Sequence, residues 1–242
     1  MAEKNLDEMR EAVEAIREKM AVAAREAGRD PAGVQLCAAC KTRTADTVAA
    51  SAALAIDVFG ENHVQELCAN YDAGAYCGKP SHFIGHLQTN KVRQVVGKVS
   101  LIQSVDSQRL LAAIDREAAR QGIVQDILLE VNIGEEASKS GFAAEDILPL
   151  MEKIGEFSNI CIKGLMAIPP ISHISGENQK FFQKMFHLSV DIRQKKYDNV
   201  KVDCLSMGMS GDFADAIASG STMVRVGTAI FGARDYARDS SK

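Results

Sequence analysis

Two short apolar stretches near the C-terminal end of the sequence are each followed by small and hydroxyl-bearing residues. Residues 202–205 and 222–226 are the apolar stretches. A β-strand that ends at Gly, Ser or Thr exposes backbone N–H groups and a hydroxyl group, which suit a phosphate. Two such strand ends side by side predict an anion-binding cup. Small and hydroxyl-bearing residues follow both stretches, at 206–210 and 227–228.

A lysine ends another apolar stretch, residues 34–40. Period-two alternation along a strand places Cys37, Ala39 and Lys41 on one face. The small Cys and Ala side chains on that face would leave room for a ligand next to the amine. A lysine that extends from a strand end into solvent is the alternative, and this feature alone leaves it open.

An amine opposite an anion site is the combination that pyridoxal 5'-phosphate (PLP) requires, because its aldehyde bonds to an amine and its phosphate needs donors. The amine must be neutral to react. With a pKa of about 10.4, a lysine is uncharged in roughly one molecule in two thousand at pH 7, and lowering that pKa by about three units raises the fraction to roughly a quarter. Partial burial and a cationic neighbour have this effect. The candidates for the neighbour are Arg43, Arg225 and Lys139.

Arg225 lies in the second apolar stretch, and alternation places it on the same face as Gly227. A guanidinium group there would donate a hydrogen bond to the pyridine nitrogen of PLP and keep that nitrogen unprotonated. The ring would then be a weak electron sink, which disfavours aminotransferase-type chemistry. The structural alternative for Arg225 is a buried ion pair with Asp203 or Glu61.

Short apolar stretches alternate with helix-period segments along the chain, which predicts parallel β/α units. The predicted strands are residues 34–40, 56–59, 82–84, 101–104, 126–132, 160–166, 202–205 and 222–226. The predicted helices are residues 45–54, 63–71, 90–96, 107–120, 145–157, 176–195, 212–218 and 231–237. An amphipathic helix within residues 1–30 precedes them, with apolar residues at three- and four-residue spacing.

Eight strands in 242 residues predict a single (β/α)8 TIM barrel that spans residues 1–242, with the N-terminal helix packed on the barrel. A flavodoxin-like or Rossmann sheet is the alternative. The chain lacks both a Gly-x-Gly-x-x-Gly motif after its first strand and a Walker-type motif, which favours the barrel. In such a barrel, functional residues lie at the carboxyl ends of the strands. The polar or rim residues expected there are Lys41, Glu61, Asn62, His86, Asp106, Asn132 and Met166.

The formal net charge of −4 gives no basic field for nucleic acid. No apolar run is long enough to span a membrane, and the N-terminus has no signal-like core, so a cytoplasmic protein is expected.

The six cysteines are expected to be free thiols. Cys37 and Cys40 lie on opposite faces of a strand and cannot share a metal ion. His82 and His86 have ligand-like spacing without a nearby carboxylate, so no metal site is predicted.

Several motifs resemble the pyridoxal phosphate homeostasis protein family. They are residues 40–43 (CKTR), 59–66 (FGENHVQE), 82–91 (HFIGHLQTNK), 130–134 (EVNIG), 138–141 (SKSG), 164–166 (GLM) and 205–210 (LSMGMS). This resemblance implies a barrel of the alanine racemase N-terminal type, with Lys41 as the Schiff-base lysine. It further implies Arg225 at the ring nitrogen, Asn62 beside the ring, and Ser206, Ser210, Gly227 and Thr228 around the phosphate. Lys139 matches a second lysine of the family, and a solvated loop lysine is the alternative.

The resemblance favours a non-enzymatic carrier that holds PLP reversibly and delivers it to apo PLP-dependent enzymes. The related racemases and decarboxylases carry an additional β-domain that supplies a second catalytic group. The chain is expected to lack that domain and to act as a monomer. A small PLP-dependent racemase or lyase with an open active site is the alternative. A cofactor-free barrel enzyme for a phosphorylated substrate, with Lys41 as acid, base or nucleophile, is a third hypothesis.

Overall fold

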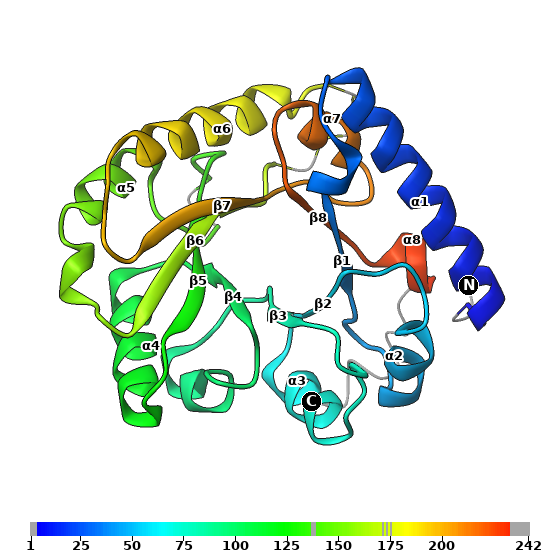
Figure 1. The fold of residues 1–242 in the computed structure, drawn as a ribbon, viewed down its shortest axis with the longest axis horizontal. Coiled ribbons are helices and arrows are strands. Elements are labelled where there is room, and N and C mark those ends of the chain that lie inside the picture. The colour runs from blue at the N-terminus through cyan, green and yellow to red at the C-terminus, as the bar shows by residue number, and fades with distance from the viewer. Residues whose placement is uncertain (1–3, 137–138, 171, 173, 175, 233–242) are drawn as a thin grey trace.

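The computed structural model describes residues 4–136, 139–170, 172, 174 and 176–232 of the chain. Eight parallel strands close into a barrel in the order of the sequence, with β8 paired to β1 (Figure 1). This confirms the predicted TIM barrel and excludes an open doubly wound sheet. The strands are β1 (Gln35–Ala39), β2 (Val58–Glu61), β3 (Ser81–Phe83), β4 (Leu101–Val105), β5 (Gln125–Val131), β6 (Ile160–Ala167), β7 (Val200–Ser206) and β8 (Met223–Val226).

Helices follow the strands and cover the outside of the barrel (Figure 1). They are α2 (Ala45–Ser51), α3 (Val64–Asp72), α4 (Gln108–Gln121), α5 (Ala144–Met151), α6 (Gln179–Gln194), α7 (Phe213–Ala218) and α8 (Thr228–Phe231), with α1 (Leu6–Glu26) before β1. Short 3-10 segments are η1 (Pro31–Gly33), η2 (Thr89–Gln94) and η3 (Ile154–Glu156).

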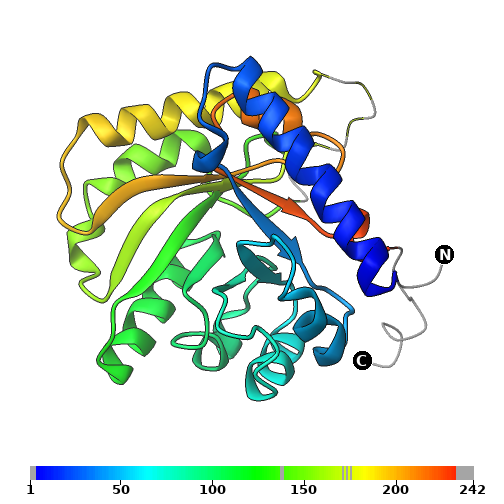
Figure 2. The same ribbon diagram turned by 45° about the vertical axis from the view of Figure 1, so that its right-hand side comes forward.

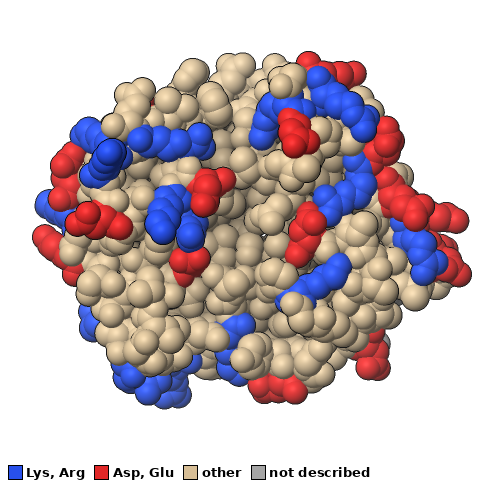
Figure 3. Space-filling model, in the orientation of Figure 1, with Lys and Arg blue, Asp and Glu red and all other residues tan. Residues whose placement is uncertain are grey.

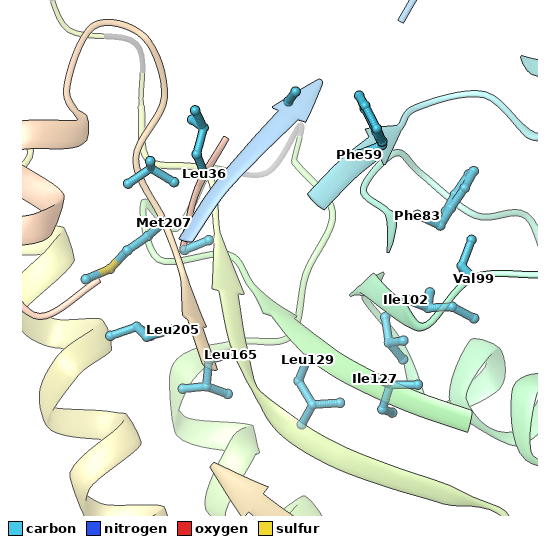
Figure 4. Packing of buried hydrophobic residues seen from close by; sticks show 14 of the residues in the cluster. Leu36, Phe59, Phe83, Val99, Ile102, Ile127, Leu129, Leu165, Leu205 and Met207 are labelled. Atoms are coloured by element: carbon cyan, nitrogen blue, oxygen red, sulfur yellow. The ribbon is translucent and has the colours of Figure 1, made fainter. Parts of the chain in front are cut away.

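Alternation along the strands sends one set of apolar side chains outward, against the helices. These side chains form the main core as a ring around the barrel (Figure 4). The opposite faces fill the barrel interior with two small clusters. One contains Cys37, Val58, Ile84 and Met223, and the other contains Leu101, Leu128 and Met166. Strand residues that face inward near a carboxyl end can therefore contribute to a site at that end of the barrel.

The N-terminal helix α1 crosses the outside of the barrel next to α7 and α8 (Figure 2). Its buried residues are Met9, Val13, Ile16, Met20, Ala23 and Ala24. Asn5 caps the first turn by accepting from the backbone N–H groups of Asp7 and Glu8, and Glu8 completes a capping box. Gly28 ends the helical region at a φ of +68°, a conformation that glycine adopts without strain.

Three predicted helices differ from the structure. Residues 90–96 were predicted as an α-helix, but the segment is the 3-10 helix η2, which contains the β-branched Val92 and stops before Gly97. The helix predicted over residues 145–157 ends at Met151 and is followed by η3. The closing helix predicted over residues 231–237 begins earlier, at Thr228, and residues 233–237 lie outside the described part of the chain.

Charged side chains of both signs are interspersed on the face shown in Figure 3, and the centre of that face is uncharged. No large area of one sign is present on this face, so it offers no field for a polyanion. Among the described residues, no helix is both long and apolar enough to cross a bilayer.

Candidate functional site

A cavity of about 350 Å³ opens at the carboxyl end of the barrel, between β1, β2 and β8. Its volume lies at the lower end of the range typical of small-molecule sites, about 300–1,000 Å³. It is lined by Ala39, Lys41, Asn62, Ile84, Ile168, Met209, Ser210, Gly211, Arg225, Gly227 and Thr228. The fold thus brings six of the predicted site residues, Lys41, Asn62, Ser210, Arg225, Gly227 and Thr228, around one space.

Lys41 reaches this cavity from a tight turn that follows β1. The next residue, Thr42, has a φ of +67°, in the left-handed region that a β-branched residue avoids. The backbone N–H of Thr42 donates to Oε2 of Glu66, in the first turn of α3, over 3.3 Å. Such strain persists where surrounding contacts impose it, and it is common at ligand sites. Here it accompanies the lysine that lines the cavity.

The loop after β7 and the start of α8 supply backbone donors to the same cavity. Gly208 has a φ of +93°, and its carbonyl accepts from the backbone N–H of Arg225. This contact holds the loop against β8. Among the described residues, none accepts a hydrogen bond from the backbone N–H groups of Ser210, Gly211, Gly227 or Thr228. The arrangement therefore presents unpaired donors to an anion.

Arg225 is buried in the barrel interior, with a relative exposure of 5%. Its Nη1 donates to the backbone carbonyl of Ser206 over 2.9 Å and to the Ser206 hydroxyl over 2.6 Å, and its Nη2 donates to the carbonyl of Ala167 over 3.0 Å. Burial lowers its pKa. Within the described chain Arg225 has no ion-pair partner, so the alternative of a buried pair with Asp203 or Glu61 is wrong.

Ser206 does not line the cavity, although it was expected around the phosphate. It is the last residue of β7, fully buried on the interior face, and its hydroxyl donates to Oε1 of Gln103 over 2.7 Å while it accepts from Arg225. As an inward-facing strand residue, Ser206 lies below the loop that forms the rim, and its place around the phosphate stays a prediction. Ser210, four residues later, lies on that loop and lines the cavity.

Glu61 and Asn62 are adjacent, yet they point to different environments. Asn62 lines the cavity, and its Oδ1 is buried without a hydrogen-bond partner among the described residues. Glu61 is fully buried between β2 and α3, where its Oε1 accepts from Asn70 over 2.8 Å and from Tyr76 over 3.0 Å. Burial raises the pKa of Glu61 to about 7. The expectation that Glu61 faces the rim is therefore wrong.

A second cavity of about 280 Å³ adjoins the first and shares Asn62, Ile84 and Ile168 with it. Lys139 lines this second cavity, where it pairs with Glu136 and donates to the carbonyl of Pro169 over 3.0 Å. Its other polar lining residues are His86, Glu130, Asn132 and Ser140. Burial, together with the negative charge of Asp106, raises the pKa of Glu130. Asp106 also lies 3.2 Å from His86.

Of the three cations considered as neighbours of Lys41, Arg225 is the one that lines the same cavity. Arg43 is held on the outer side, where its guanidinium group donates to the carbonyl of Gly232 over 2.9 Å and lies 5.8 Å from the Phe231 ring centroid. Lys139 lies in the adjoining cavity.

Two interior residues were missed by the sequence analysis as parts of this site. Gln103 of β4 contacts Ser206, and it donates through Nε2 to Nδ1 of His82 over 2.8 Å. His82 had been considered as a metal ligand. A polar residue at an inward-facing position of a predicted barrel strand is the signal that could have identified Gln103, because such a group must find a partner inside the barrel.

The cysteines match the expectation of free thiols, since all six are unpaired. Cys37 belongs to an interior cluster and Cys40 to the outer core, on opposite sides of β1 as predicted. Among the described residues, no group of three or more His, Cys, Asp and Glu side chains has a metal-binding arrangement.

The family model described as "Alanine racemase, N-terminal domain" matches residues 12–235. A relative from Aquifex aeolicus named "Pyridoxal phosphate homeostasis protein" is 40% identical over 219 residues, which cover 90% of this chain and 95% of the relative.

Two solved structures show the same fold. PipY of Synechococcus elongatus with PLP bound superposes with a TM-score of 0.76 at 31% identity, covering 90% of this chain and 100% of PipY. An alanine racemase from Clostridium difficile superposes with a TM-score of 0.72 at 14% identity, covering 93% of this chain and 56% of the racemase. At that identity the racemase shows the fold alone.

Proposed function

The chain belongs to the pyridoxal phosphate homeostasis protein family, within the wider alanine racemase N-terminal domain family, and we propose that it is a PLP carrier. It binds PLP reversibly at Lys41, serves intracellular vitamin B6 homeostasis, and does not turn over amino acids. The observation that carries the proposal is the single cavity lined by an amine, a buried guanidinium group and unpaired backbone donors.

The residues that line the cavity fit the functional groups of PLP. When bound, PLP supplies an aldehyde that condenses with an amine, a phosphate and a ring nitrogen. Lys41 provides the amine. Ser210, Gly227 and Thr228 provide donors for the phosphate, and Arg225 provides a charged donor for the ring nitrogen. Asn62 Oδ1, buried and unpartnered, provides an acceptor beside the ring.

Arg225 also restricts what can happen to bound PLP. A guanidinium group stays protonated and can donate hydrogen bonds but cannot accept them. The ring nitrogen that it contacts must therefore accept, and so stays unprotonated. The ring then withdraws electrons weakly, which suits storage better than carbanion chemistry. The ionisable side chains that line this cavity are Lys41 and Arg225. A reaction that requires an acid or base on the opposite face of the ring has none within this cavity.

The adjoining cavity supports the alternative, a racemase or lyase with an open site. Glu130, with its raised pKa, and Lys139 line it, and either is a possible second proton donor. The carrier proposal assigns Lys139 no essential role in binding PLP. The carrier and the racemase or lyase differ in whether amino acids are converted, so an assay of amino-acid turnover separates them.

The test of binding is a visible spectrum after incubation with PLP, followed by borohydride reduction and mass mapping of the labelled peptide. We expect the absorption of a PLP–lysine linkage and a label on Lys41. Lys41→Ala loses both, whereas Lys139→Ala, as the matched control, keeps them. A wild-type protein that stays colourless favours the cofactor-free barrel enzyme.

The test of the carrier role uses PLP-loaded protein and a panel of D- and L-amino acids. We expect neither enantiomer exchange nor consumption. Turnover at about one per second or faster contradicts the carrier role. In a second arm, loaded protein is mixed with an apo PLP-dependent enzyme, and the enzyme is expected to recover activity.

We also propose where the protein acts and in which oligomeric state. The six unpaired cysteines fit the reducing cytoplasm. We propose that residues 1–242 act as one domain and as a monomer, which sedimentation of the PLP-loaded protein checks.

A further inference from the structure

A chain of four buried polar side chains runs through the barrel interior beneath the cavity. Arg225 Nη1 lies 2.6 Å from Ser206 Oγ, and Ser206 Oγ lies 2.7 Å from Gln103 Oε1. Gln103 Nε2 lies 2.8 Å from His82 Nδ1 and 3.1 Å from Met223 Sδ. All four polar residues have a relative exposure of 6% or less. The chain connects β8, β7, β4 and β3.

The hydrogen bonds in this chain run from Arg225 toward His82. A guanidinium group donates and cannot accept, so the Ser206 oxygen is the acceptor of Arg225, and the Ser206 hydroxyl in turn donates to Gln103 Oε1. This fixes the amide of Gln103, whose Nε2 must then donate to His82. Nδ1 of His82 is therefore the unprotonated nitrogen, which agrees with burial lowering the pKa of His82 to about 4.

The direction of the chain determines how Arg225 is held. Two of its hydrogen bonds go to Ser206 and one goes to the carbonyl of Ala167, all within the barrel. The remaining N–H donors belong to the same Arg225 guanidinium group, and Arg225 lines the cavity. Buried networks in which every member is satisfied are rigid, because any rotation leaves a buried group unpaired.

We propose that Gln103 is a positioning residue for PLP, acting through the hydroxyl of Ser206 to fix the guanidinium group of Arg225 against the ring nitrogen. Gln103 does not touch the ligand. Without its Oε1, the Ser206 proton loses its acceptor, the hydroxyl rotates, and Arg225 keeps only its bonds to the two backbone carbonyls, so its orientation is held less firmly. The inference rests on the proposed PLP-binding function and adds a residue that lies outside the family motifs of this chain.

The test measures PLP affinity and the visible spectrum of the Gln103→Met variant. Methionine conserves length and packs flexibly but offers no strong acceptor. We expect about fivefold weaker PLP binding, the size expected for a lost buried hydrogen bond, and a shifted absorption maximum. A PLP analogue with C–H in place of the ring nitrogen should bind wild type and variant equally, because it lacks the atom that Arg225 contacts.

The matched control is Gln125→Met. Gln125 is also a buried barrel glutamine, but it begins β5 at the opposite end, where it contacts Gly97 and Val99. We expect Gln125→Met to lower the melting temperature and to leave PLP affinity and spectrum unchanged. If Gln103→Met fails to fold, Ser206→Ala removes the same hydrogen bond between Ser206 and Gln103. We expect the same weaker PLP binding and shifted absorption maximum from it.

A double-variant comparison completes the test. Gln103→Met and Ser206→Ala should shift affinity and spectrum alike, and the double variant should add nothing to either. Unchanged PLP binding in both single variants, additive effects, or an equal loss for the analogue without the ring nitrogen each overturns the inference. A wild-type protein that fails to bind PLP instead overturns the proposed function.

Discussion

The backbone N–H of Thr42 donates to the carboxylate of Glu66 over 3.3 Å, which ties the turn that carries Lys41 to the first turn of α3. The contact connects the β1 and β2 units of the barrel at the rim of the cavity. It holds Thr42 in a left-handed conformation that threonine does not favour on its own. The position of Lys41 therefore depends on a strained residue and on a carboxylate from a different β/α unit.

Thr42→Gly is expected to stabilise the protein and to weaken PLP binding. Glycine removes the strain at φ +67°, and the net gain after the added backbone entropy of glycine is about 0.5–1 kcal/mol, or roughly 2 °C in melting temperature. The freed turn holds Lys41 less firmly, which lowers PLP affinity. Calorimetry and PLP titration check both effects. Thr47→Gly, within α2, is the control and should destabilise. A lower melting temperature for Thr42→Gly would contradict the claim that the conformation of Thr42 destabilises the folded protein.

Arg225→Asp is expected to change the spectrum of bound PLP. A carboxylate in place of the guanidinium group favours a protonated ring nitrogen, whose absorption differs from that of the neutral ring. Arg225→Lys keeps a positive charge but loses the planar arrangement of donors, so it should weaken PLP binding without protonating the ring. Spectra of the two variants across pH separate these effects. An unchanged spectrum in both variants would mean that Arg225 does not contact the ring nitrogen.

Glu61→Gln is expected to remove a decrease in stability with rising pH. Burial raises the pKa of Glu61 from 4.5 to about 7, so between these values the folded protein holds a proton that the unfolded chain has lost. The contribution of Glu61 to the free energy of unfolding therefore falls as pH rises through this window, by an amount on the order of 3 kcal/mol, and levels off above pH 7. Denaturation at pH 5 and pH 8 checks this. Glu61→Gln should be more stable than the wild type at pH 8. Equal dependence of stability on pH in the two proteins would refute the raised pKa of Glu61.

His82→Gln is expected to have the opposite effect. Burial lowers the pKa of His82 from 6.5 to about 4, so between these values the unfolded chain holds a proton that the folded protein lacks. This residue makes the free energy of unfolding rise with pH over that window. Its contribution and that of Glu61 have opposite signs between about pH 4.5 and 6.5 and largely cancel. His82→Gln should therefore leave stability falling with pH there, whereas Glu61→Gln leaves it rising. Parallel slopes in the two variants would contradict this account.

Local patterns in the sequence were sufficient for the barrel and for much of the cavity. Period-two alternation separates Cys37 from Cys40 and puts Arg225 on the inner face, because a strand fixes side-chain direction by covalent geometry alone. The count of β/α units predicted closure. Lys41, Gly227 and Thr228 follow strand ends, and in a parallel barrel all such ends lie at one rim.

Only the tertiary structure decided which polar residues meet. Ser206 and Ser210 both follow the same apolar stretch, yet one supports Arg225 from below and the other lines the cavity, because strand packing rather than spacing sets their depth. Glu61 turns toward Tyr76 on the outside of the barrel. The contact between Ser206 and Gln103 spans 103 residues. Such contacts arise from barrel closure, which brings distant strands together in a low-dielectric interior where an unpaired polar group is costly.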